Sequence, residues 1–219
     1  MTPRRDTLLI VLALATGATD AAAFERLGHV FASVITGNLV VLGVGAVSGD
    51  HHLTLFAGCA LAAYSVGVLL AAPRERKPPP KQGWPPGATA ALTGELILLI
   101  AFAVCWELGG RHPTEGWQVV LIVLGASAMG VQSTAVRRLG QVSTTYLTST
   151  LTGLLEDLRG RRRSEGQARS VGILAMALAG AAAATGLILH AHRILPTLQL
   201  APVAAVILAS RRLVVDSPD

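Results

Sequence analysis

Six long apolar runs constrain this chain more than any other feature of its sequence. Each run is about long enough to cross a lipid bilayer as a helix. Only 14% of all residues are charged, whereas a soluble domain carries about a quarter. The sequence therefore predicts an all-α integral membrane protein. The expected crossings are residues 7–24, 53–72, 88–107, 117–136, 170–189 and 194–210.

The basic residues are distributed as topology signals. A net charge of +5 would suggest nucleic-acid binding in a soluble domain. Here the arginines and lysines stand in short runs between apolar segments, which is typical of loops that fix membrane orientation. We therefore expect the lipid bilayer as a partner and no nucleic acid. Cys59 and Cys105 lie inside apolar runs without metal-ligand spacing, so we expect free thiols, no metal and no cofactor.

The N-terminal segment has two interpretations. Two arginines, an apolar run at 8–15 and small residues at 21–23 resemble a cleavable signal peptide. Against this, Thr16, Thr19 and Asp20 recur loosely in an internal repeat. The recurrence favours a helix that is kept in the protein.

The chain contains an internal repeat. Each half reads as a membrane helix, a segment broken by Thr with Gly or Ser, and two further helices, as in many transporters. The expected repeats are residues 1–108, with the broken segment 27–48, and residues 109–219, with the broken segment 141–158. The matching tripeptides, Arg26-Leu27-Gly28 and Arg138-Leu139-Gly140, are 112 residues apart, and residues 35–39 align with 147–151 at the same spacing.

Charge distribution indicates how the two halves are oriented. If both broken segments cross the membrane, eight crossings leave 10 basic residues inside and 8 outside. If each segment enters and leaves on one side, six crossings leave 15 inside, and only Arg26, Arg111 and Arg193 outside. The positive-inside rule favours the second arrangement. We therefore expect six helices as two inverted repeats of three, in a bacterial inner membrane, with both termini cytoplasmic.

Two motifs resemble the signatures of the YoaK family of bacterial membrane proteins, which is catalogued as a domain of unknown function. The first is Thr16-Gly17-x-Thr19-Asp20 followed by Thr36-Gly37-Asn38, and the second is Met129-Gly130-Val131-Gln132 followed by Thr145-Tyr146-Leu147-Thr148. The sequence departs from the family at Ser149, where Gly is usual. The resemblance covers essentially the whole chain and implies about six membrane helices and a transport role, without a substrate.

The broken segments are the predicted solute site. Gly37 releases backbone groups that neighbouring Thr and Asn side chains can satisfy. A half-helix starting at Leu39 would point its positive end to the membrane middle, and one starting at Leu151 would face it. Two facing helix N-termini would suit an anion or a carboxylate. The alternative is plain helix packing through small residues.

Asp20 and Glu95 are the acidic residues expected at or near membrane depth. Acidic side chains at this depth commonly mark an ion or proton path. Glu95 is predicted to couple a proton or cation, or else to reach water near a helix start. Asp20 is predicted to couple, or else to bond Thr16 or cap the neighbouring broken segment. Gln132, or Ser133 if the repeat slips by one position, would be its neutral counterpart.

We therefore predict a permease for a small solute that works by alternating access. A passive channel, or a membrane scaffold or assembly factor without transport, is the alternative, and the glycine-rich helix faces allow a homodimer. An enzyme is not expected, because no nucleophile–base pair is recognisable. The expected solute contacts are Thr19, Thr36, Gly37, Asn38, Gln132, Thr148, Ser149 and Thr150, with Asp20 and Glu95 as coupling residues.

Overall fold

The computed structural model describes residues 3–72, 84–139, 151–156 and 167–215, and this part of the chain is mostly helical. Within it, six helices are long and apolar enough to cross a membrane. The prediction of six membrane helices is thus confirmed, with ends that differ by a few residues. The helices are α1 (Pro3–Arg26), α2 (Ile35–Ser48), α3 (His51–Ala71), α4 (Pro86–Gly109), α5 (Glu115–Arg138), α7 (Gln167–His190), the short 3₁₀ helix η1 (His192–Ile194) and α8 (Leu195–Val215).

Four helices form the centre of the bundle. α5 packs on α4 and meets α1, while α8 packs on both α1 and α4. α3 lies along α5 and α7 lies along α1, both toward the outside. Burial follows this arrangement, because 72% of the most apolar stretch of α5 is buried, against 28% for α3 and for α7. Since α1 fills part of the centre, its removal as a signal peptide would open the core.

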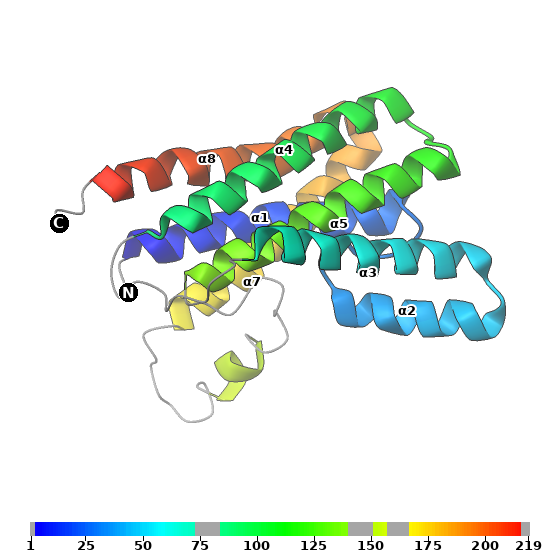
Figure 1. Ribbon diagram of the computed structural model, residues 1–219, viewed down its shortest axis with the longest axis horizontal. Helices are drawn as coiled ribbons and strands as arrows, with labels where there is room; N and C mark the ends of the chain where they lie inside the picture. Colours follow the sequence, from blue (N-terminus) through cyan, green and yellow to red (C-terminus); the bar gives the residue numbers. More distant parts are fainter. Residues whose placement is uncertain (1–2, 73–83, 140–150, 157–166, 216–219) are drawn as a thin grey trace.

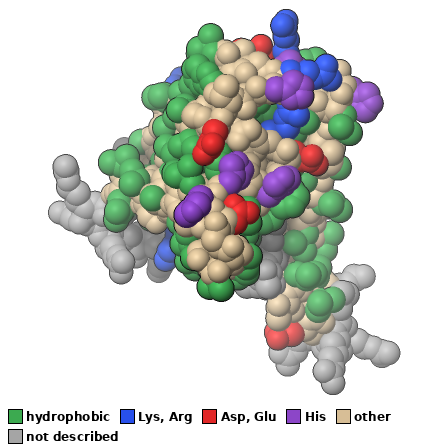
Figure 2. All heavy atoms as spheres, turned by 90° about the vertical axis from the view of Figure 1, so that its right-hand side faces the viewer, with side chains coloured by type: hydrophobic (Ala, Val, Ile, Leu, Met, Phe, Trp, Pro, Cys, Tyr) green, Lys and Arg blue, Asp and Glu red, His purple; other side chains and the backbone are tan. Residues whose placement is uncertain are grey.

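The chain termini lie at one end of the bundle, and charged and histidine side chains gather at the other. α1 begins and α8 ends at the same end, which agrees with an even number of crossings (Figure 1). At the opposite end, Arg26 donates a hydrogen bond to the carbonyl of Arg111. Arg111 in turn lies 3.3 Å from the carbonyl of Leu189. Figure 2 looks onto this end, where basic, acidic and histidine side chains gather while hydrophobic side chains cover the flanks.

Two pairs of parallel helices meet through glycines. α1 runs parallel to α7, because Asp6 lies near Arg169 at one end and Glu25 near Thr185 at the other. Where the helices cross, a Cβ added to Gly17 would overlap the carbonyl of Ala177, and one added to Gly180 would overlap that of Leu14. Small residues let membrane helices approach this closely.

The pair α3 and α5 repeats this contact. A Cβ at Gly67 would overlap the carbonyl of Ser127, and one at Gly130 would overlap that of Tyr64. Each of these four residues stands 113 positions from its equivalent in the α1–α7 crossing. The constant spacing supports the predicted inverted repeat, which remains a prediction, and it corresponds to the one-position slip noted in the sequence.

α2 follows a loop of residues 27–34 that turns back along α1, and we call this segment the re-entrant loop. α1 ends at Arg26, but the following loop turns back, and Ser33 bonds to Asp20, more than one turn below the end of α1. The reversal is made by consecutive residues with left-handed backbone, Gly28 (φ 84°) and His29 (φ 57°). α2 then returns and packs as a hairpin against α3. The prediction that segment 27–48 enters and leaves on one side agrees with this path. Of the second broken segment, 141–158, only the helical residues 151–156 are described.

The glycine contacts yield a test on one helix. Gly180→Ala should lower the free energy of unfolding by about 1–3 kcal/mol, the usual cost of overpacking, because the new methyl group would overlap Leu14. Gly186→Ala is the matched control on α7, since nothing lies within 4 Å of its added Cβ. It should be neutral or stabilising, because Ala is the better helix former. Equal unfolding temperatures for the two variants in detergent would contradict the contact.

The re-entrant path can be tested by single-cysteine labelling with Cys59 and Cys105 replaced by Ser. Glu25→Cys, at the end of α1, and His51→Cys, at the start of α3, should react with an impermeant thiol reagent from the same side of the membrane. Ala72→Cys, just beyond α3, should react only from the opposite side. Labelling of positions 25 and 51 from opposite sides would mean that α2 spans the bilayer.

Candidate functional site

Glu95 lies in the middle of the bundle without any solvent exposure (0%). It belongs to α4, on the face that also buries Leu92, Leu99 and Phe102. Among the described residues, Glu95 is the one acidic residue that is buried, whereas Asp20 is partly exposed. The alternative that Glu95 reaches water near the start of α4 is therefore wrong, because its position in the third turn directs it into the centre.

A chain of hydrogen bonds ties Glu95 to two other helices. Gln132 on α5 donates from Nε2 to Glu95 Oε1 at 2.8 Å. Thr16 on α1 donates from its hydroxyl to Gln132 Oε1 at 2.7 Å. All three side chains are at most 1% exposed. This central polar network, Thr16–Gln132–Glu95, connects α1, α5 and α4 inside the apolar core.

The second oxygen of Glu95 has no partner. Oε2 is buried and accepts no hydrogen bond, and no ion pair to Glu95 is found among the described residues. Buried carboxylate oxygens are normally hydrogen-bonded, and exceptions call for an explanation such as an unseen water, an ion or a functional role. The network can therefore accept one more hydrogen, either a proton on Oε2 or a donor from a bound molecule.

Asp20 fixes the re-entrant loop. Its Oδ1 accepts from the backbone N–H of Ser33 at 2.7 Å, and its Oδ2 accepts from the Ser33 hydroxyl at 2.5 Å. Asp20 thereby bonds the loop that precedes α2, whereas the N-cap of α2, Val34, has no side-chain hydrogen bond. Asp20 thus acts as a tether between α1 and the loop, separate from the central polar network.

The Thr36-Gly37-Asn38 motif lies in the first turn of α2 and not at a break. Asn38 is fully buried, and its amide both accepts from Phe31 N–H at 2.9 Å and donates to Phe31 C=O at 2.6 Å. The expected start at Leu39 is wrong, because α2 begins at Ile35. The chain reversal comes earlier, at Gly28 and His29, and Asn38 stabilises it by bonding back to the loop.

The structure brings together only part of the predicted site. Of the predicted residues, Gln132 and Glu95 lie in the central polar network, whereas Thr36 is exposed on α2. Thr19 is buried and bonds the carbonyl of Ala15 on its own helix at 2.8 Å. Thr148, Ser149 and Thr150 lie outside the described residues.

Sequence reasoning missed two central residues. Thr16 appeared only as part of a motif, yet its hydroxyl completes the central network. Gln199 on α8 is fully buried, and neither its amide nitrogen nor its oxygen has a hydrogen-bond partner. An uncharged amide inside the apolar run 194–210 is the signal that could have pointed to it.

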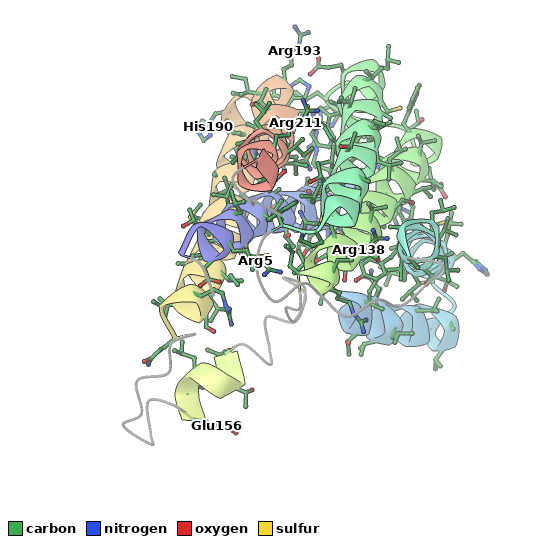
Figure 3. All side chains as sticks on the ribbon, turned by 60° about the vertical axis from the view of Figure 1, so that its left-hand side comes forward. Arg5, Arg138, Glu156, His190, Arg193 and Arg211 are labelled. Atoms are coloured by element: carbon green, nitrogen blue, oxygen red, sulfur yellow. The ribbon has the colours of Figure 1, made fainter. Side chains whose placement is uncertain are left out.

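The buried Arg5 and the half-buried Arg138 mark the end of the bundle where α1 begins and α5 ends (Figure 3). Arg5 donates to the carbonyl of Leu139 at 2.6 Å, and Arg138 donates to the carbonyl of Ala71 at 2.5 Å. These are cations at helix C-termini, where free carbonyls favour positive charge. Arg5 therefore closes the end of α5 and does not contact Glu95.

Comparison with known proteins identifies the family. The family model described as "Protein of unknown function (DUF1275)" matches residues 8–210. The chain is 38% identical over 160 residues to the UPF0700 transmembrane protein YoaK of Bacillus subtilis (strain 168), a match covering 72% of this chain and 68% of the Bacillus protein. No solved structure matches the chain. With this match along nearly all of its six apolar helices, the chain belongs to the DUF1275 family of membrane proteins.

Proposed function

We propose that this protein is a permease that moves a small solute across the bacterial inner membrane, with Glu95 binding the coupled proton or cation. The observation that carries the proposal is the buried Glu95 carboxyl with one unpartnered oxygen. A charge placed at membrane depth without a countercharge is costly, so such residues commonly serve ion or proton movement.

The two glycine-packed pairs are candidates for the moving parts. α1 with α7 and α3 with α5 each meet through backbone-to-backbone contacts, so each pair should move as one body. Arg5 joins the two bodies at one end of the bundle through the carbonyl of Leu139, and Thr16 and Gln132 join them by a hydrogen bond next to Glu95. Rocking of one body against the other would change this bond and expose the centre to alternate sides, as expected for inverted repeats.

The state of Glu95 and the position of the two bodies would be linked. An ionised Glu95 favours an arrangement in which water or a cation reaches Oε2, while a protonated Glu95 tolerates an arrangement in which its side chain is fully buried. Any group bound more tightly in one arrangement shifts the equilibrium toward it. This linkage would couple proton movement to solute movement.

We also propose the orientation. The end of the bundle with Arg5, Arg138, Arg169 and Arg211 would face the cytoplasm, following the positive-inside rule. The re-entrant loop and its Asp20 tether would then close the centre on the outer side. Release of the tether would be one step of outward opening.

Glu95→Gln should abolish the pH dependence of transport, because glutamine fits the same space and bonds Gln132 but cannot bind or release a proton. The assay is charge and proton movement in proteoliposomes challenged with amines, amides, amino acids and carboxylates. Glu107→Gln is the matched control, since Glu107 lies on the same helix and is exposed. It should behave as the wild type.

Three outcomes of this assay would contradict the proposal. The first is a Glu95→Gln protein whose transport keeps the wild-type pH profile. The second is a steady conductance that does not saturate with solute, which would indicate a passive channel. The third is the absence of any solute-dependent signal from folded wild-type protein, which would favour a scaffold.

Asp20→Asn should loosen the re-entrant loop. The Ser33 N–H would keep an acceptor in the amide oxygen, but the Ser33 hydroxyl would have to turn and accept from the amide nitrogen. Hydrogen bonds to a neutral amide are roughly half as strong as those to a carboxylate. Hydrogen exchange of residues 29–34 should accelerate, while that of α4 stays unchanged. Asp50→Asn is the control, because Asp50 caps α3 through Leu53 N–H and Asn caps a helix equally well. Unchanged exchange in the Asp20 variant would refute the tether.

A further inference from the structure

Gln199 is the buried polar group that the fold leaves unexplained. It is 0% exposed, and both polar atoms of its amide lack hydrogen-bond partners. A primary amide placed in an apolar interior without hydrogen bonds is unfavourable, and a hydrocarbon side chain of similar size would avoid this cost. Packing alone therefore gives no reason for glutamine at this position.

The register between α4 and α8 locates Gln199 relative to Glu95. The helices run antiparallel, since Trp106 Nε1 donates to His192 C=O at 3.0 Å and Thr89 Oγ lies 3.3 Å from Ser210 Oγ. Gln199 follows His192 by seven residues, so it lies level with Leu99, which precedes Trp106 by seven residues. Leu99 is four residues from Glu95, or about 6 Å along the axis of α4.

The two residues also occupy matching positions on their helices. Buried positions of α4 recur on α8 at a constant spacing of 104 residues, and at this spacing Glu95 corresponds to Gln199. If the halves are inverted copies, each contributes one buried polar side chain to the centre. The matched positions are Leu92, Glu95, Leu99, Phe102 and Trp106 on α4, and Pro196, Gln199, Val203, Val206 and Ser210 on α8.

The groups around this centre are mainly hydrogen-bond acceptors. Glu95 Oε2 and Gln199 Oε1 are both unpartnered. Pro202, inside α8, has no N–H to offer the carbonyl of Leu198 one turn earlier. The unpartnered donor is the Gln199 amide nitrogen. Acceptors in excess, with a carboxylate among them, suit a ligand that carries N–H groups and disfavour an anion.

We propose that Gln199 and Glu95 together form the solute site, at the α4–α8 contact, and that it binds a small molecule through its N–H groups, as an ammonium, a guanidinium or a primary amide carries them. The proposal rests on the proposed permease function and replaces the anionic solute suggested by the facing helix ends. Side chains about one turn apart on packed helices can both contact a molecule of a few non-hydrogen atoms.

The test is thermal unfolding of the purified full-length protein in detergent with paired probes. Methylammonium and acetamide carry N–H groups, whereas tetramethylammonium and N,N-dimethylacetamide are their partners without N–H groups. The N–H probes should raise the Tm by about 2–4 °C near saturation, and their methylated partners and acetate should not. An equal rise with tetramethylammonium, or a rise with acetate alone, would overturn the proposal.

Gln199→Leu separates a binding role from a structural one. Without probe, its Tm should be at or above that of the wild type, because two unpartnered polar atoms are removed, and the rise with N–H probes should vanish. Gln167→Leu, the same change at the start of α7, should keep that rise. If Gln199→Leu does not fold, Gln199→Met serves instead. A rise preserved in the folded Gln199 variant would overturn the proposal.

This inference and the proposed function can fail separately. Suppose that the N–H probes bind through Gln199 but transport by Glu95→Gln keeps its pH dependence. The solute site would then stand and the proposed coupling through Glu95 would be refuted. Suppose instead that no probe changes the Tm, while transport depends on pH and loses this dependence in Glu95→Gln. The permease would then stand and the proposed solute class would be refuted.

Discussion

The contacts of four glycines with facing backbone carbonyls hold this protein together. Lipid tails are as apolar as leucine, so membrane helices gain little from hydrophobic attraction to one another and depend on close packing. Gly17, Gly67, Gly130 and Gly180 provide this closeness at two crossings, α1 with α7 and α3 with α5. A side chain at any of these positions would overlap the opposite backbone.

These crossings also determine where the polar network lies. Thr16 directly precedes Gly17, and Gln132 follows Gly130 by two residues, so the contacts that join each helix pair also set the height of both side chains. Thr16 and Gln132 then meet between the pairs, and Gln132 reaches Glu95. The structural contact and the candidate site are therefore parts of one arrangement.

The sequence predicted the long-range organisation better than the local details. Run length predicted the six apolar helices, and the positions of Arg26, Arg111 and Arg193 predicted that segment 27–48 returns to its own side, with which the path of the loop and α2 agrees. These signals depend on membrane thickness and charge, which act on whole segments. The start of α2 was wrong by four residues because Gly37 was taken as the break. The actual reversal at Gly28 and His29 depends on backbone angles and on the Asn38–Phe31 pairing, which no periodicity encodes.

The candidate site was recovered in part, for a related reason. A carboxylate or a motif stands out in an apolar run, so Glu95 and Gln132 could be predicted. Whether a polar side chain is satisfied depends on partners far away in sequence. Asn38 was predicted to contact a solute, but its amide is hydrogen-bonded to Phe31 in its own loop. Gln199 was not predicted as a site residue, and its amide has no hydrogen-bond partner.

In the proposed scheme, the single free oxygen of Glu95 decides whether proton and solute move in opposite directions or together. Oε2 can hold a proton or accept an N–H group of the solute, and a bound proton reduces its strength as an acceptor. Proton and solute would then compete for the same atom, and by linkage each would weaken the binding of the other.

Competition at one site under alternating access gives exchange, in which the solute leaves one side as a proton enters from the other. A second carboxylate in the centre would have allowed both to travel together. Among the described residues, the position that matches Glu95 in the other half holds an uncharged amide, so the arrangement favours exchange over co-transport.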